Sequence, residues 1–189
     1  MLEAIDARRS VSSRHLAEPA PDDATLLRML RSAVRVPDHG KRVPFRFIRI
    51  AGDARIALGD AVAARGLALR PDAGDGAVEK DRLRFTRAPL VVAVVAVFDD
   101  ADPAIPAQER LLTAGSVCFA LLQAAQAFGF GACWLTGWPA YDADVLRLLG
   151  LGVQERIAGF IHIGTPIQEP NERDRPDPAA LLGDWSPPA

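Results

Sequence analysis

Residues 111–141 read LLTAGSVCFALLQAAQAFGFGACWLTGWPAY and contain no charged side chain. The run is long enough to cross a bilayer, but Gln123, Gln126, four glycines and Pro139 interrupt it. Its FGFG segment at 128–131 has the pattern of a helix end followed by a strand. We therefore expect a helix and a strand buried in protein, at the centre of the domain, and no membrane span.

The helix in this run is expected to extend from Pro106 to Phe128. Its apolar residues occupy more than one stripe, and a sheet can cover only one of them. A second surface has to cover the rest, and a partner subunit is the natural candidate. The pattern predicts a homodimer.

Helix and strand signals alternate along the rest of the chain. Residues 90–98, LVVAVVAVF, are typical of a strand buried on both faces, whereas residues 70–76 have the composition of a mobile loop. The tail from Glu169 onward is rich in Pro, Asp and Arg, and its Trp185 needs something to pack on. The other expected helices are 2–9, 24–34, 53–69 and 141–149, and the other expected strands are 45–50, 132–136 and 157–163.

Composition narrows the function classes. The chain has 189 residues, of which 49% are hydrophobic and 24% charged, and a net charge of -2, as expected for one soluble domain. This balance argues against nucleic acid as a partner, because phosphate binding needs a basic field. Cys118 and Cys133 lie in apolar surroundings and are expected to be structural thiols. The start lacks the pattern of a signal peptide, so we expect a cytoplasmic protein.

The motif inventory excludes several chemistries. The chain has no G-x-G-x-x-G or G-K-[ST] loop, and the hydroxyl of Ser116 falls in the middle of a helix rather than on a nucleophile elbow. Its histidines, His15, His39 and His162, have no metal-ligand spacing, so no metal site is expected. Few groups remain for acid-base catalysis. This favours an enzyme whose chemistry is carried by a cofactor, with no catalytic side chain of its own.

Two polar motifs are candidate ligand contacts. Arg8, Arg9 and Ser10 come where the first helix ends, and two guanidiniums beside a hydroxyl can hold a phosphate. The alternative is a solvated helix end. Arg35 to His39, RVPDH, places a histidine in a loop that can contact a ligand; alternatively Asp38 caps a turn and His39 faces solvent.

Two further motifs follow expected strands. Residues 133–138, CWLTGW, bring two tryptophans and a hydroxyl to a strand end, which suits a planar heteroaromatic ligand, although tryptophan is more often a core residue. Gly164-Thr165-Pro166 closes the last strand. Arg173 and Arg175 come soon after it and either add positive charge over a phosphate or decorate a polar tail.

Together these strings resemble the nitroreductase family of flavoproteins, most closely its small YdjA-like branch. The resemblance covers essentially the whole chain, in the branch's order and approximate spacing. Its motifs are RRS at 8–10, AEPAP at 17–21, R-x-P-D-H at 35–39, PFRF at 44–47, RAPL at 87–90, GFG with W-x-[ST]-G at 129–137, G-F-x-x-x-G-T-P at 159–166 and PDP at 176–178.

The resemblance implies an α+β homodimer of a single domain, residues 1–189, with a mostly antiparallel central sheet flanked by helices. Two FMN molecules are implied at the subunit interface, and a C-terminal tail from about residue 167 is expected to extend over the partner. The implied FMN contacts are Arg8, Arg9 and Ser10 from one subunit and Arg35 and His39 from the other. Trp134, Leu135 and Thr136 are implied along the isoalloxazine, and Arg173 and Arg175 are further implied FMN contacts. Ala124, Gln126 and Gly129 are implied near the nicotinamide of NADH or NADPH.

The implied activity is FMN-dependent reduction of a small electron-poor acceptor, such as a nitroaromatic or a quinone, by ping-pong hydride transfer from NAD(P)H. Three positions depart from the family pattern. Ser12 replaces a lysine near flavin N1 and O2, so its charge has to come from elsewhere, for example from Arg14. Val43 replaces a glutamine, and Leu135 replaces an arginine beside the ring. These losses leave open a non-catalytic flavin-binding or structural dimer of the same fold.

Overall fold

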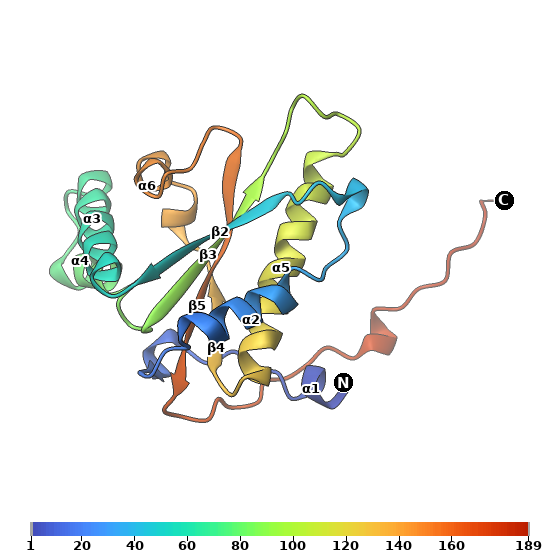
Figure 1. Ribbon diagram of the computed structural model, residues 1–189, viewed down its shortest axis with the longest axis horizontal. Helices are drawn as coiled ribbons and strands as arrows, with labels where there is room; N and C mark the ends of the chain where they lie inside the picture. The colour runs from blue at the N-terminus through green and yellow to red at the C-terminus, as the bar shows by residue number, and fades with distance from the viewer. Residues whose placement is uncertain (1, 189) are drawn as a thin grey trace.

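β3 (Leu90–Val97) lies in the middle of the sheet. Its first seven residues are buried, as its continuous apolar sequence predicts. In the computed structural model, which describes residues 2–188, β3 pairs with β2 (Phe45–Ala51) on one side and β5 (Glu155–Pro166) on the other. The far edge of β5 pairs with both β1 (Leu16–Ala17) and β4 (Gly131–Leu135). All these pairs are antiparallel, which confirms the predicted sheet (Figure 1).

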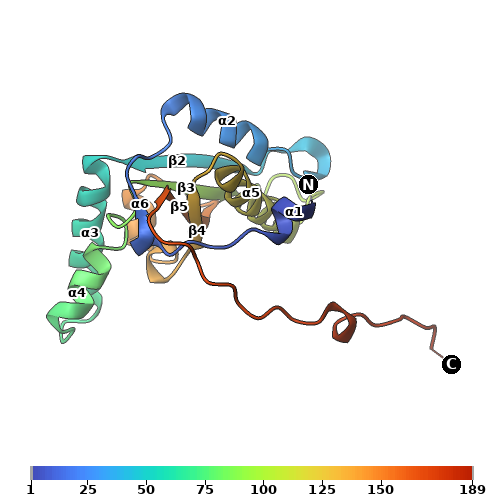
Figure 2. The same ribbon diagram turned by 90° about the horizontal axis from the view of Figure 1, so that it is seen from below.

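Helices cover both faces of the sheet, so its core has two layers. On one face α2 (Asp23–Ala33) and α5 (Ala107–Ala127) pack on the strands, as Figure 2 shows. On the other face lie α3 (Asp53–Leu69) and α6 (Ala143–Leu148). α4 (Asp75–Arg82) packs beside α3 and not on the sheet. This arrangement is the α+β architecture that the sequence predicts.

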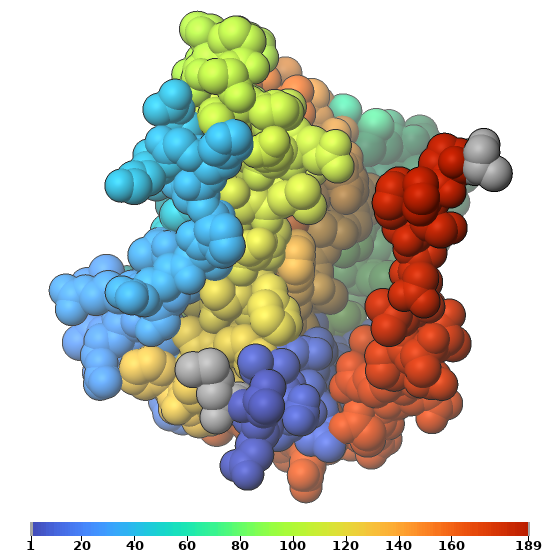
Figure 3. All heavy atoms as spheres, turned by 90° about the vertical axis from the view of Figure 1, so that its right-hand side faces the viewer, coloured from blue at the N-terminus to red at the C-terminus, as the bar shows by residue number. Residues whose placement is uncertain are grey.

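α5 is the predicted central helix, and its two stripes have different surroundings. Val117, Cys118 and Leu121 are fully buried against the sheet. Leu112 and Phe119 remain 61% and 45% exposed, because no described residue covers that side of the helix. Figure 3 looks onto this surface, with α5 in yellow between the α2–β2 connection in blue and the C-terminal segment in red. A second apolar surface is therefore exposed on α5, as its sequence indicates.

Several element boundaries differ from the sequence expectation. Residues 70–76 were expected to form a loop, but Asp75 and Gly76 begin α4, whose acidic first turn favours a helix N-terminus. α1 (Leu2–Asp6) is shorter than expected, so Arg8 and Arg9 lie beyond its end. β1 was not expected, because two residues are too few for a recognisable alternation. Short 3₁₀ helices occur at Ser13–His15, His39–Lys41, Trp138–Ala140 and Pro178–Ala180.

Residues 167–188, called the arm below, leave the sheet after β5 and extend away from it (Figures 1 and 2). Every residue from 171 to 188 is exposed. The partner expected for Trp185 is not found within the described residues, since this side chain is 83% exposed, and Leu181 and Leu182 are exposed to a similar degree. No helix in residues 2–188 has both the length and the apolar character needed to span a membrane.

Candidate functional site

Trp134 and Thr136 are held at the open edge of the sheet. β4 pairs only with β5, so its outer edge has no neighbouring strand among the described residues. The Trp134 indole Nε1 donates a hydrogen bond to the Ala158 carbonyl oxygen at 3.1 Å. The ring lies directly over Gly159, where a methyl group would lie only 2.0 Å from Nε1. Gly159 therefore lets the indole lie flat on the strand, with one side accessible.

A cavity of about 530 Å³, called the Trp134 cavity below, opens beside this indole. It brings together Arg8, Ser10, Trp134 and Thr136, four of the residues expected in the site. Leu135 neighbours the cavity in sequence but does not line it. The remaining lining residues come from α5, β5 and the segment before α6, and they are Phe119, Leu122, Tyr141 and Ala158.

The basic end of this cavity continues into the arm. Arg9 forms an ion pair with Glu172 at 2.5 Å, and Arg175 binds the same carboxylate at 2.8 Å. Burial and the charges of Arg175 and Arg173 lower the pKa of Arg8, and Glu172 opposes them only in part. The structure thus brings together the four arginines predicted as FMN contacts, and Glu172 pairs with two of them, Arg9 and Arg175. The cluster carries excess positive charge.

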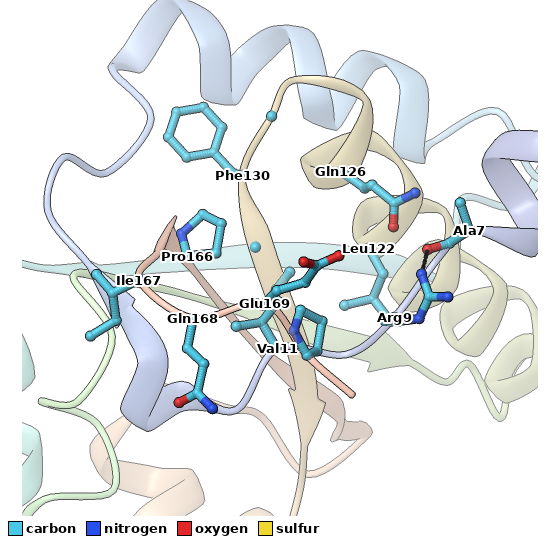
Figure 4. A pocket seen from close by; sticks show the side chains of 14 residues that line it. Ala7, Arg9, Val11, Leu122, Gln126, Phe130, Pro166, Ile167, Gln168 and Glu169 are labelled. Atoms are coloured by element: carbon cyan, nitrogen blue, oxygen red, sulfur yellow. Dashed lines mark hydrogen bonds between the residues drawn. The ribbon is translucent and has the colours of Figure 1, made fainter. Parts of the chain in front are cut away.

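A second cavity of about 480 Å³, the Gln126 cavity, is lined by Arg9 (Figure 4). Gln126 and Gly129, two of the three residues predicted near the cosubstrate, line it. Gln126 donates a hydrogen bond to the Ala4 carbonyl, and Arg9 donates one to the Ala7 carbonyl. Ala124 does not line this cavity, because its side chain is buried in the core against the sheet.

Arg35 and His39 lie apart from these residues, in the α2–β2 connection. The Asp38 carboxylate accepts hydrogen bonds from the backbone N–H groups of Arg42 and Val43, and it caps the turn. The exposed ring of His39 contacts Glu109 at the start of α5. Neither Arg35 nor His39 lines the Trp134 cavity of its own chain. Contact with a flavin would therefore require the cavity of a second chain.

Both cysteines are buried free thiols, as predicted. Burial raises the pKa of Cys118 to about 12 and that of Cys133 to about 11. Both thiols stay protonated at neutral pH, so neither is a reactive nucleophile. The cavity chemistry does not involve a cysteine.

Sequence reasoning missed Phe119, Leu122, Tyr141 and Ala158 of the cavity lining and Glu172 of the arm. Phe119 carries a detectable signal, because it lies on the second apolar stripe of α5. Tyr141 is the sole tyrosine of the chain and follows the two-tryptophan motif closely, which would have been grounds to include it. Glu172, which bridges Arg9 and Arg175, was missed because acidic residues in a polar tail usually face solvent.

The fold and the edge cavity together indicate the class of protein. An antiparallel sheet flanked by helices here carries an edge cavity that is lined by three aromatic side chains and by Arg8, with three further arginines close to Arg8. The nitroreductase family model matches residues 5–165 of the chain. The protein belongs to the nitroreductase family, a class of oxidoreductases.

Individual relatives agree with this placement. A protein of Escherichia coli strain K12 with the provisional name NAD(P)H nitroreductase YdjA is 36% identical over 182 residues, which cover 96% of this chain and 97% of that protein. The structure of a nitroreductase-like family protein from Bacillus cereus superposes with a TM-score of 0.81 at 25% identity, covering 97% of this chain and 95% of the other. A nitroreductase-fold protein from Desulfovibrio desulfuricans, solved with FMN, superposes with a TM-score of 0.73 at 23% identity. The superposition covers 98% of this chain and 97% of the other.

Proposed function

We propose that the protein is an FMN-dependent NAD(P)H oxidoreductase whose flavin binds in the Trp134 cavity. The observation that carries this proposal is the convergence of Arg8, Ser10, Trp134 and Thr136 on one cavity from two segments that lie far apart in the sequence. FMN has an anionic phosphate at one end and a planar ring at the other, and these residues divide in the same way. The names of the Escherichia coli relative and of the FMN-bound neighbour support the same cofactors.

The arginine cluster fits the phosphate. Arg8 and Arg9, with Arg173 and Arg175 from the arm, would donate charge-assisted hydrogen bonds to phosphate oxygens. Burial, and after it the charges of Arg175 and Arg173, lower the pKa of Arg8, and a phosphate would relieve the repulsion between these arginines. The Arg173 guanidinium has no hydrogen bond to another residue in the described range, whereas that of Arg175 is bonded to Glu172. Arg173 is therefore the more available phosphate contact.

The ring end would be completed by a second copy of the chain. Trp134, Leu135 and Thr136 would line the isoalloxazine, and Arg35 and His39 of a partner subunit would reach it from outside. The exposed stripe of α5 supports a homodimer, because exposed apolar side chains on a central helix are costly in water. The distal half of the arm would then pack over the partner.

Bound here, FMN would supply the hydride-transfer chemistry of a ping-pong reaction between NADH or NADPH and a nitroaromatic or quinone. The residues of the chain would bind and orient the reactants and exclude water. Gln126 and Gly129 of the Gln126 cavity, with the backbone near Ala124, are the proposed contacts of the nicotinamide cosubstrate. The bulk of the rate enhancement would come from proximity and orientation.

A second function, flavin binding without turnover, is favoured by the three positions that depart from the family pattern, Ser12, Val43 and Leu135. Anaerobic mixing with NADH and with NADPH separates the two. Loss of the flavin absorbance at a rate that supports turnover identifies an oxidoreductase. A flavin that stays oxidised identifies a binding protein.

Arg8→Ala tests the phosphate end. One lost charge-assisted contact weakens FMN binding about ten- to hundredfold, from roughly 1.5–3 kcal/mol per bond. Riboflavin, which lacks the phosphate, should bind the variant and the wild type equally. Apoprotein titrations with both flavins measure this preference, and Arg147→Ala, an exposed arginine on α6, is the matched control. Unchanged FMN affinity in the Arg8→Ala protein would mean that Arg8 does not bind the phosphate and belongs to a solvated segment.

A further inference from the structure

Glu172 joins the arm to the rest of the chain. The backbone N–H of Ile167, the first residue of the arm, donates a hydrogen bond to the His15 carbonyl at 3.0 Å. Beyond Ile167, the only ion pair or hydrogen bond between the arm and residues 2–166 joins Glu172 Oε2 to Arg9 Nη2, at 2.5 Å. This carboxylate is therefore the polar attachment of the arm beside the arginine cluster.

The Glu172 carboxylate engages the hydrogen-bond donors that a phosphate would use. Its Oε1 accepts hydrogen bonds from both Nε and Nη2 of Arg175, at 3.2 and 2.8 Å, so the fork of that guanidinium is taken up. Oε1 also accepts one from the backbone N–H of Arg173 at 3.0 Å. Arginine binds phosphate oxygens through the same fork. Glu172 and a phosphate therefore compete for Arg9 and Arg175.

The contact is exposed enough to be exchanged. The side chains of Arg9, Glu172 and Arg175 are 33%, 49% and 41% exposed. Ion pairs as exposed as these contribute little to stability, so the carboxylate can leave without unfolding the protein. A phosphate carries about −1.5 to −2 charges and three acceptor oxygens, so it gains more from the arginines than a carboxylate does. A singly charged ligand only replaces one carboxylate by another.

Resting on the proposed function, we infer that Glu172 is a specificity-determining residue, which competes with the flavin phosphate for Arg9 and Arg175 and reserves them for a doubly charged anion. The phosphate of FMN displaces the carboxylate, whereas a singly charged anion does not. The exchange keeps the arm attached, because Arg173 and Arg175 of the arm then hold the same phosphate as Arg8 and Arg9. Glu172 thereby sets the affinity of this end of the site.

The central test is a titration of apoprotein with FMN and with riboflavin. Glu172→Gln keeps the size of the side chain but removes its charge, and it should tighten FMN binding about fivefold, as expected for the loss of exposed ion pairs. Riboflavin, which has no phosphate, should bind as it does to the wild type. Asp174→Asn is the matched control, because Asp174 is exposed two residues further on and forms no ion pair within residues 2–188. It should change FMN affinity by less than about twofold, since solvent ions screen a charge without a contact.

Two further measurements locate the competition at the arginine donors. At constant ionic strength, inorganic phosphate should compete with FMN for the wild type and acetate should not, whereas both should compete for the Glu172→Gln protein. In an Arg175→Ala background, Glu172→Gln should tighten FMN binding by less than about twofold, because the fork that it frees is no longer there.

The outcomes distinguish this inference from the proposed function. Weaker FMN binding by Glu172→Gln would mean that the carboxylate orients the arginines for the phosphate, and this result or an unchanged affinity overturns the inference and leaves the oxidoreductase proposal intact. An equal gain for riboflavin, an equal gain in Asp174→Asn, or acetate competition in the wild type also overturns it. If wild-type apoprotein binds FMN no tighter than riboflavin, the proposed phosphate end fails and the inference fails with it.

Discussion

The arm differs from the sheet and its helices in how far its apolar side chains are buried. In the sheet, every strand is hydrogen-bonded to strands of the same chain, and helices of the same chain cover both faces. In the arm, three large apolar side chains, those of Leu181, Leu182 and Trp185, are more than 70% exposed, although the chain orders a 3₁₀ turn beside them. Burying such side chains contributes roughly 1.5–3 kcal/mol each. The difference supports the proposal that the arm packs on a second copy of the chain.

The largest expected effect comes from removing the apolar side chains of the arm. In a Leu181→Ala, Leu182→Ala, Trp185→Ala protein, the proposed dimer should dissociate at least about a thousandfold more readily, since more than about 4 kcal/mol of burial is lost. Sedimentation equilibrium measures the dissociation constant. The unfolding free energy of the dilute protein should change by less than about 0.5 kcal/mol, because these side chains touch little of their own chain.

Val153→Ala is the control for this experiment. Val153 is 91% exposed, but it lies in the loop before β5 and outside the arm. It should leave the association unchanged. An undiminished dimer in the triple variant would contradict the assignment of the arm to the partner.

The next prediction compares a glycine in the sheet with a glycine in the arm. Gly159→Ala places a methyl group 2.0 Å from Trp134 Nε1, so the indole or β5 has to move, at a cost of about 3 kcal/mol in unfolding free energy. Gly183→Ala in the arm meets no atom within 4 Å and should change stability by less than about 0.5 kcal/mol. Urea unfolding of both variants measures the difference. Equal losses would mean that the arm is packed as tightly as the sheet.

The smallest effect is a dependence of stability on pH. The pKa of His162 is about 4 in the folded protein and about 6.5 in the unfolded chain, so between these values the unfolded state binds more protons. Stability is therefore complete above about pH 6.5 and falls as the pH drops toward 4, by about 2 kcal/mol between pH 7 and 5. His162→Leu should remove this slope without loss at pH 7, because neither ring nitrogen has a partner within residues 2–188.

Urea unfolding at the two pH values tests this prediction. Asp184→Asn is the matched control, because Asp184 is a titratable residue that is exposed in the arm. It should leave the slope in place. A His162→Leu protein with the wild-type pH dependence would show that another group causes it.

The elements predicted well are those whose sequence reports burial directly. β3 and α5 were recognised from long apolar runs, because a strand that is covered on both faces and a helix at the centre of the domain are mostly apolar. α4 was missed because DGAVEKDR packs on another helix and buries only Asp81. Only the family resemblance linked Arg8 to Arg173 and Arg175. No local pattern can link Arg9 to Glu172, because the fold alone brings these distant segments together.

β5 is the common neighbour of β1, β3 and β4, and it is the last strand of the sheet in chain order. Residues near the beginning of the chain depend on it: Leu16 pairs with Pro166, and the Thr165 hydroxyl donates to the Pro19 carbonyl at 2.8 Å. During synthesis, only the β2–β3 pair can form before β5 emerges. Pairings between such distant segments make folding slow, and they leave the edge of β3 open in the meantime. The nascent chain should therefore be most prone to aggregation, or most dependent on a chaperone, until residue 166 has been made.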